Sequence, residues 1–182
     1  APFLQEIREF RGVLRRRTAL LERAARGGGP AEGIEAWDEA LAARGAAVVR
    51  LRREIMAEAA GRAGRLLDEI LGGESGFSME YLCSFDPAGE GPEEALREAL
   101  SRARDAERRR GYTMAGPQYD DARILLEGVD IRRYGSQGRK RLAALALKLA
   151  QALTILEKRG ERPLQILDDI YSELDPIVVE RV

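Results

Sequence analysis

The chain has 182 residues, enough for one domain or two small ones, and its formal net charge at pH 7 is only −1. Charged residues make up 34% and aromatic residues 5%, which favours amphipathic helices with charged surfaces over a β-sandwich. One cysteine excludes an intramolecular disulfide, and the lack of histidine removes the commonest metal ligand. No apolar run approaches the roughly 18 residues of a membrane span, so we expect a cytoplasmic α/β protein in which helix dominates, without membrane contact.

The first 73 residues carry the periodicity of two amphipathic helices. Apolar side chains recur every three or four residues over 3–25, with Arg17 as the one interruption. A second run with this spacing covers 35–71, and a Gly-rich segment separates the two. Because neither helix can bury its apolar stripe alone, residues 1–73 are predicted to form a helical hairpin, an arm domain. A local bend or break in the second helix is predicted at Gly45, Gly61 and Gly64.

Residues 74–182 read as a second domain of mixed helix and strand. Its strands are indicated by alternating apolar residues and its helices by apolar spacing of three and four. The predicted elements are a strand at 77–82, a helix at 93–110, strands at 122–127 and 130–134, a helix at 139–158 and a buried strand at 164–167. The apolar side of the helix at 139–158 is expected to bury Leu142, Leu145, Leu149, Leu153 and Leu156.

The segment Gly135-Ser136-Gln137-Gly138-Arg139 opens the helix at 139–158 and has the chemistry of an anion site. A helix N-terminus leaves backbone N–H groups unpaired, and the helix dipole adds positive potential there. Ser136 can donate its hydroxyl proton, and Gly138 lets a phosphate approach the backbone. The alternative interpretation is that Ser136 only caps the helix, since serine is a favoured N-cap.

A second group of polar residues follows the predicted strand at 164–167. Asp168 and Asp169 stand where that strand ends, and Ser172 and Asp175 follow within a few residues. Adjacent carboxylates are costly to bury, but they suit a Mg²⁺–phosphate complex. An acidic turn without such a role is the alternative, and Ser172 and Asp175 favour the functional interpretation.

These motifs together resemble the RecF family of DNA repair proteins, which are ABC-type ATPases. The resemblance covers essentially the whole chain, including the arm. It rests on Tyr112 to Pro117, Asp120-Asp121, Gly135 to Gly138, Ala144 to Ala150, Leu167 to Asp169 and Ser172 to Asp175, and in the arm on Val13 to Leu21 and Trp37 to Leu41.

The resemblance implies a helical arm followed by the C-terminal lobe of an ABC-type ATPase head. Ser136, Gln137, Gly138 and Arg139 would form the signature motif, which reaches the ATP held by a partner subunit. Asp168 would direct Mg²⁺, through water, as the Walker B aspartate. The catalytic carboxylate would be Asp169, and Ser172 to Asp175 would form the D-loop.

The resemblance also implies partners and an activity. Family members dimerise on ATP, bind double-stranded and gapped DNA, and work with RecR and RecO to load RecA. A weak ATPase is expected of the full-length protein. The phosphate-cradling loop Gly-x-x-x-x-Gly-Lys-Ser/Thr does not occur in these residues, so the chain alone is expected to be inactive. The first residue, Ala1, and the ending just after the D-loop predict a piece of a longer protein.

The chain departs from the family pattern at a few positions, and other interpretations of its function are open. The family usually has His and Arg where this chain has Gln118 and Tyr119, and ABC-type ATPases commonly have Glu in place of Asp169. Another SMC-like ATPase is one alternative, and a non-enzymatic helical-hairpin scaffold is the other. Clustered positive charge suits DNA phosphates, so DNA-contact candidates are Arg15, Arg16, Arg17, Arg50, Arg52 and Arg53, with a solvated helix face as the alternative.

Overall fold

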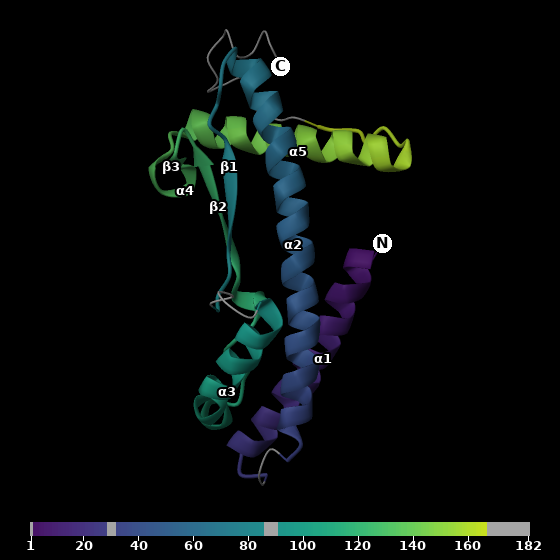
Figure 1. Ribbon diagram of the computed structural model, residues 1–182, viewed down its shortest axis with the longest axis vertical. Helices are drawn as coiled ribbons and strands as arrows, with labels where there is room; N and C mark the ends of the chain where they lie inside the picture. The colour runs from purple at the N-terminus through teal and green to yellow at the C-terminus, as the bar shows by residue number, and fades with distance from the viewer. Residues whose placement is uncertain (1, 29–31, 86–90, 167–182) are drawn as a thin grey trace. The chain divides into compact units, whose positions relative to one another are not determined.

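The computed structural model describes residues 2–28, 32–85 and 91–166 (Figure 1). The chain divides into two compact units, one of residues 1–53 and 82–121 and the other of residues 54–81 and 122–182. This division does not follow the boundary predicted at residue 73, because the long second helix contributes to both units. The assignment of an arm and an ATPase lobe to the two sides of that boundary stays a prediction.

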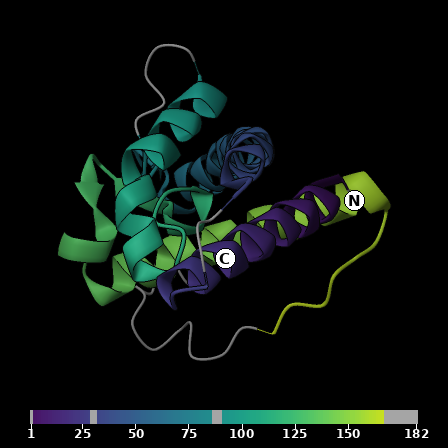
Figure 2. The ribbon, with the colours of Figure 1, turned by 90° about the horizontal axis from the view of Figure 1, so that it is seen from below.

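The first unit is helical. It contains α1 (Pro2–Ala25), the first part of α2 (Ile34–Leu71) and α3 (Pro92–Arg110), and both α1 and α3 lie beside that part of α2 (Figure 2). The helices begin and end close to where the apolar periodicity predicted. The chain directions of α1 and α2 are opposite, as expected of a hairpin (Figure 1). At its closed end, Leu21 packs against Ile34, and both are fully buried.

The predicted break in α2 is wrong, because one continuous helix runs through all three glycines. Gly45 is explained by packing: a Cβ there would overlap the Leu96 side chain of α3 and would lie 3.3 Å from Pro117 Cδ. At Gly61 a Cβ would meet only the end of the Arg65 side chain, at 3.8 Å. The helix therefore tolerates its glycines, and one of them makes room for a neighbouring helix.

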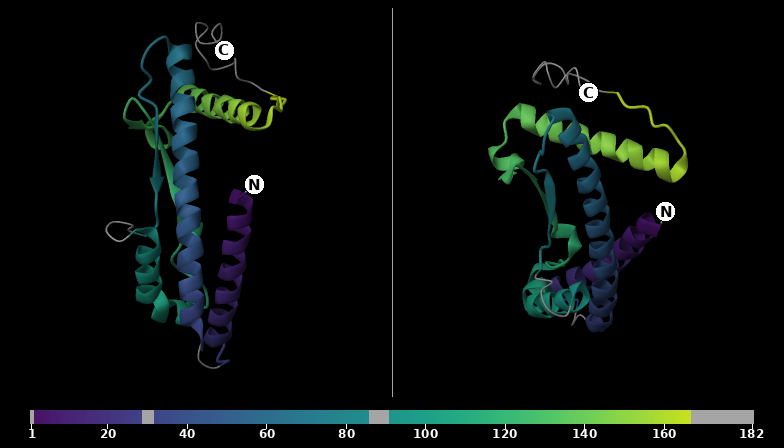
Figure 3. Two further views of the ribbon diagram at one scale, coloured as in Figure 1. Left: turned by 45° about the vertical axis from the view of Figure 1, so that its right-hand side comes forward. Right: turned by 45° about the horizontal axis from the view of Figure 1, so that its top comes forward.

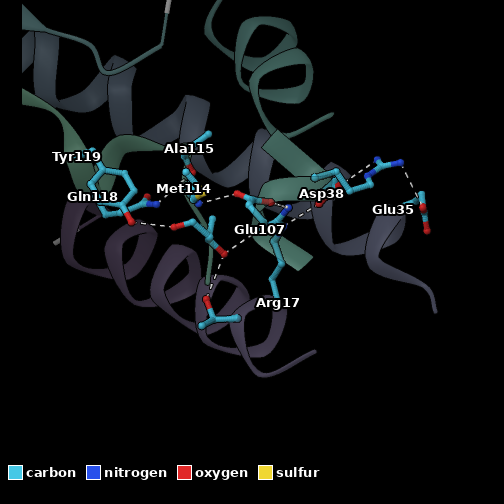
Figure 4. Close-up of polar contacts among 11 residues, drawn as sticks. Arg17, Glu35, Asp38, Glu107, Met114, Ala115, Gln118 and Tyr119 are labelled. Atoms are coloured by element: carbon cyan, nitrogen blue, oxygen red, sulfur yellow. Dashed lines mark hydrogen bonds and ion pairs between the residues drawn. The ribbon is translucent and has the colours of Figure 1, made fainter. Parts of the chain in front are cut away.

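A buried arginine connects the elements of the first unit (Figure 4). The side chain of Arg17 is fully buried, although the sequence pattern marked it as an interruption of the seam. Its Nε donates to Asp38 Oδ1 at 2.7 Å, and its Nη2 donates to Glu107 Oε2 at 2.6 Å. Its Nη1 donates to Thr113 Oγ1 at 2.9 Å, and Glu107 Oε1 accepts from the Met114 N–H at 2.6 Å. One cation thus joins α1, α2, α3 and the segment after α3.

The second unit contains a small sheet and α5 (Gln137–Arg159), which crosses the last part of α2 (Figure 3). The strands are β1 (Ser78–Leu82), β2 (Asp121–Leu126) and β3 (Val129–Asp130), in the order β1-β2-β3. The pair β2–β3 is antiparallel and closes through a two-residue turn, since Leu126 pairs with Val129. The core of this unit consists of Ala63, Leu67, Ile70, Leu126, Ile131, Leu142, Ala143, Ala146 and Ala150.

Three local predictions for this unit are wrong. The predicted strand at 130–134 is largely the short helix α4 (Ile131–Tyr134), because the Asp130 carboxylate accepts from the N–H groups of Arg132 and Arg133 and so caps the start of a helix. Residues 164–166 form no strand, since no described strand lies beside them to complete a ladder. Burial was also predicted on the apolar side of α5 and in the segment at 164–167, but Leu153, Leu156, Leu164 and Ile166 are exposed.

Replacing Arg17 by methionine should destabilise the protein strongly. The change leaves the carboxylates of Asp38 and Glu107 buried without this partner, and breaking a buried ion pair costs about 3–5 kcal/mol. Arg15→Met, at an exposed position on the same helix, should change the unfolding free energy by no more than about 0.5 kcal/mol. Urea unfolding of both variants checks this, and equal midpoints would contradict it.

The glycines of α2 should respond oppositely to alanine. Gly61→Ala removes backbone freedom at an exposed site and should stabilise the protein by up to about 1 kcal/mol. Gly45→Ala gains the same propensity but forces Leu96 away, and overpacking costs about 1–3 kcal/mol. Thermal unfolding should show a raised midpoint for the first variant and a lowered one for the second. A raised midpoint for both would show that α3 does not pack closely on Gly45.

Candidate functional site

The turn at Gly135–Arg139 opens α5 as predicted, with Ser136 as the N-cap residue. Ser136 has extended backbone angles, φ −62° and ψ 162°, and its Oγ accepts from the Arg139 N–H at 3.3 Å. The preceding Gly135 is tightly packed, because a Cβ there would lie 2.6 Å from the carbonyl oxygen of Ile131. Its own N–H donates to that oxygen at 3.1 Å. The turn between α4 and α5 is therefore fixed on both sides.

This turn is open to solvent and carries positive potential. Ser136, Gln137 and Arg139 are exposed and Gly138 is half-buried. The N–H groups of Gln137 and Gly138 have no acceptor within the helix, because they belong to its first turn. No acidic residue occupies that turn, so nothing in it offsets the positive end of the helix dipole. The arrangement suits an approaching anion.

The hydroxyl of Ser136 can serve as cap and as ligand at the same time. A serine hydroxyl has one donor proton and two acceptor lone pairs. Capping uses an acceptor lone pair toward the Arg139 N–H, and the proton stays available to an oxygen outside the helix. The two interpretations of Ser136 drawn from the sequence are therefore compatible.

Arg139 has a partner that the sequence analysis missed. Its Nη2 donates to Glu127 Oε2 at 2.6 Å, in an ion pair whose side chains are 44% and 58% exposed. Glu127 is the first residue of the β2–β3 turn and has a positive φ of 53°; Gly128, with φ 75°, is the second. The sequence analysis placed Glu127 at the end of a strand. The available signal was the Gly128 that follows it, since such turns take residues with positive φ at both positions.

The acidic half of the predicted site lies outside the described residues. Asp168, Asp169, Ser172 and Asp175 all fall within 167–182. Within the described ranges, no group of three or more His, Cys, Asp or Glu residues could hold a metal ion. The metal and catalytic roles of these aspartates stay predictions.

The candidate DNA-contact arginines divide into three groups by burial. Arg15, Arg16, Arg50 and Arg53 are exposed, and the Arg16 guanidinium lies 5.7 Å from the centre of the Trp37 ring. Arg52 is half-buried and donates to the Pro117 carbonyl oxygen at 2.5 Å. The expectation for Arg17 needs correction, because its fully buried guanidinium is committed to Asp38, Glu107 and Thr113.

Gln118 and Tyr119, where the resemblance implies His and Arg, both have internal hydrogen bonds. Gln118 Nε2 donates to the Ala115 carbonyl oxygen at 3.1 Å, and the Tyr119 hydroxyl donates to the Thr113 carbonyl oxygen at 2.8 Å. Both bonds hold the segment after α3 to itself (Figure 4). In the described part of the chain, no helix combines the length and apolarity that crossing a membrane requires.

A scan against models of protein families finds no match, whereas comparison with individual proteins finds several. The chain is 36% identical over 175 residues to the DNA replication and repair protein RecF of Halothermothrix orenii, covering 93% of this chain and 47% of the relative. RecF of Chloroflexus aurantiacus is 40% identical over 144 residues, covering 76% of this chain and 36% of the relative.

A solved structure matches as well. The structure described as the recombination mediator protein RecF-ATP in the RecFOR pathway superposes with a TM-score of 0.82 at 29% identity. The match covers 99% of this chain and 50% of that one, so the chain spans about half the length of the proteins it resembles. The fold is thus that of a helical arm with part of an ABC-type ATPase head. The sequence and the fold agree, and the chain belongs to the RecF family of DNA replication and repair proteins.

Proposed function

We propose that this chain supplies the signature half of a composite ATP site in an ATP-dependent DNA repair protein. The observation that carries the proposal is the exposed first turn of α5, where Ser136 caps the helix and keeps its hydroxyl proton available. A triphosphate brought by a second subunit meets that proton, the N–H groups of the turn and the side chain of Arg139. Donors fixed before the ligand arrives bind anions without the cost of ordering them.

Each residue of the turn has a distinct task in this proposal. The Ser136 hydroxyl donates to a terminal phosphate oxygen while its lone pair holds the Arg139 N–H. Gly138 has no Cβ, so the phosphate can approach the backbone closely. Gln137 lies on the exposed side of the same turn and offers amide donors to the phosphates. The site is complete only in a homodimer of the full-length protein, where the phosphate-cradling loop of one subunit, which does not occur in these residues, meets this turn of the other.

The remaining roles follow from the family. A RecF structure with ATP supports ATP as the nucleotide. Asp168 would hold Mg²⁺ through water, Asp169 would activate the attacking water, and Ser172 and Asp175 would transmit the state of one site to the other. Double-stranded and gapped DNA, and RecR with RecO, are the proposed partners, with slow ATP hydrolysis timing their release. The cytoplasmic location remains a prediction.

Replacing Ser136 by aspartate should separate capping from phosphate binding. Aspartate is as good an N-cap as serine, so the melting temperature should stay the same or rise. Its carboxylate would repel a triphosphate, so ATP-dependent dimerisation of the full-length gene product should fall at least about tenfold, the effect of about 1.4 kcal/mol. Light scattering with and without ATP measures the dimer, and nucleotide binding to the monomer should persist.

Ser136→Asn is the matched control for that variant. Asparagine also caps helices, but its side chain is neutral and carries amide donors, so dimerisation should survive in large part. Wild-type dimerisation by the aspartate variant would show that Ser136 acts only as a cap.

The exposed arginines of the first unit should contribute to DNA binding through charge alone. Arg15→Gln and Arg50→Gln should each weaken binding to duplex DNA and reduce the slope of log affinity against log salt by about 1. Arg65→Gln removes another exposed arginine, from the last part of α2, and serves as the control. Fluorescence anisotropy at several salt concentrations measures the slopes. Slopes unchanged from wild type in the first two variants would favour a solvated helix face.

A further inference from the structure

Ser75, a buried residue that follows α2, is hydrogen-bonded to the last turn of that helix. Asp68, in the last turn of the helix, accepts from the Ser75 N–H through Oδ1 at 2.7 Å. Hydrogen bonds from the Ser75 side chain and backbone keep the pKa of Asp68 below its ordinary value. Ser75 is only 2% exposed, so the segment returns to the helix it has just left. The backbone after α2 is therefore fixed relative to its last turn.

The same residue holds the turn of the β2–β3 hairpin. The carbonyl oxygen of Ser75 accepts from the Glu127 N–H at 3.2 Å. Next to it, a Cβ on Gly76 would lie 3.2 Å from Glu127 Cα and from Glu127 N, so the two backbones are in close contact. The absence of a side chain at Gly76, which has φ 56°, allows this approach.

Glu127 continues the connection to the signature turn. Its carboxylate binds the Arg139 guanidinium at 2.6 Å, and the Arg139 N–H is the group that Ser136 caps. Hydrogen bonds and one ion pair thus lead from the end of α2 to the first turn of α5. Every residue of this route belongs to the second unit.

Glutamate is an unfavourable residue at position 127, which indicates that its side chain has a specific role. The first position of such a turn has positive φ, which favours Asn, Asp or Gly, and a glutamate pays a conformational cost there. An ion pair as exposed as this one contributes little to folding, about 0–1 kcal/mol. Its consequence is instead where the Arg139 guanidinium rests: beside the Gly135–Arg139 turn and not free in solvent.

We propose that Glu127 is a positioning residue for the signature turn, which it ties to the exit of α2 through Ser75 while holding Arg139 ready for the partner's triphosphate. This inference rests on the proposed function for the role of Arg139, and on the hydrogen bonds of the chain itself for the connection. Glu127 does not touch the nucleotide. It acts by limiting the motion of the residues that do.

The first experiment compares Glu127→Gln, Glu127→Asp and wild type in the full-length gene product. Glutamine keeps the length of the side chain but removes the charge, so amide hydrogen exchange at residues 136–140 without ATP should accelerate about fivefold. The ATP concentration for half-maximal dimerisation should rise by a similar factor, while ATP binding to the monomer and the melting temperature stay as in wild type. Aspartate restores the charge and should recover part of both effects.

The second experiment tests the connection from its other end. Asp68→Asn weakens the bond to Ser75 and should also accelerate exchange at residues 136–140, although it lies in a different helix. Combined with Glu127→Gln, the effects should be less than additive, because both changes act on one route. Independent additive effects, or unchanged exchange in the glutamine variant, would overturn the proposal.

The two proposals fail in distinguishable ways. If the wild-type protein does not dimerise with ATP, the proposed function is wrong, and the exchange measurements still decide whether Glu127 ties the turn to α2. Suppose instead that the wild-type protein dimerises with ATP and that Glu127→Gln reaches half-maximal dimerisation at the same ATP concentration. The signature site then stands, and the positioning role of Glu127 is overturned.

Discussion

The buried guanidinium of Arg17 is the constraint on which the first unit depends. A charge without solvent must be paired on every side, and here two carboxylates and a threonine hydroxyl surround it. Because Asp38 and Glu107 lie on different helices, the pairing is satisfied only when α1, α2 and α3 are in one arrangement. Apolar stripes alone would allow these helices to slide. We interpret the network as a device that selects one register, at a cost in desolvation.

The second unit faces a different problem under the proposed function, because the Gly135–Arg139 turn would have to be both rigid and exposed. Burial could not hold residues that meet a ligand. Local bonds do so instead: Ser136 caps α5, and Gly135 packs against the carbonyl oxygen of Ile131. The apolar side of α5 anchors the rest of the helix on Ala63, Leu67 and Ile70 of α2. The turn is therefore held in place by its contacts within the second unit and remains exposed to solvent.

The candidate site was predictable in its local parts and not in its connections. Ser136 and its neighbours could be assigned because capping and dipole effects depend on a few adjacent residues. The partner of Arg139 could not, since Glu127 reaches it only through the folding of a hairpin. The same limit applies to Arg17, which looked like a surface residue until its carboxylate partners were in place. An isolated sequence gives charges but not their distances.

The sequence by itself determined the helices α1, α2, α3 and α5, the strands β1 and β2 and the family, because periodicity and adjacent motifs carry that information. Tertiary structure alone decided the rest. It placed Leu96 against Gly45, so that a residue read as a helix breaker became a packing position in a continuous helix. It also left Leu153 and Leu156 exposed where an apolar stripe predicted burial. The burial of side chains and the pairing of charges depend on which elements pack together, so neither can be predicted from the sequence of one segment.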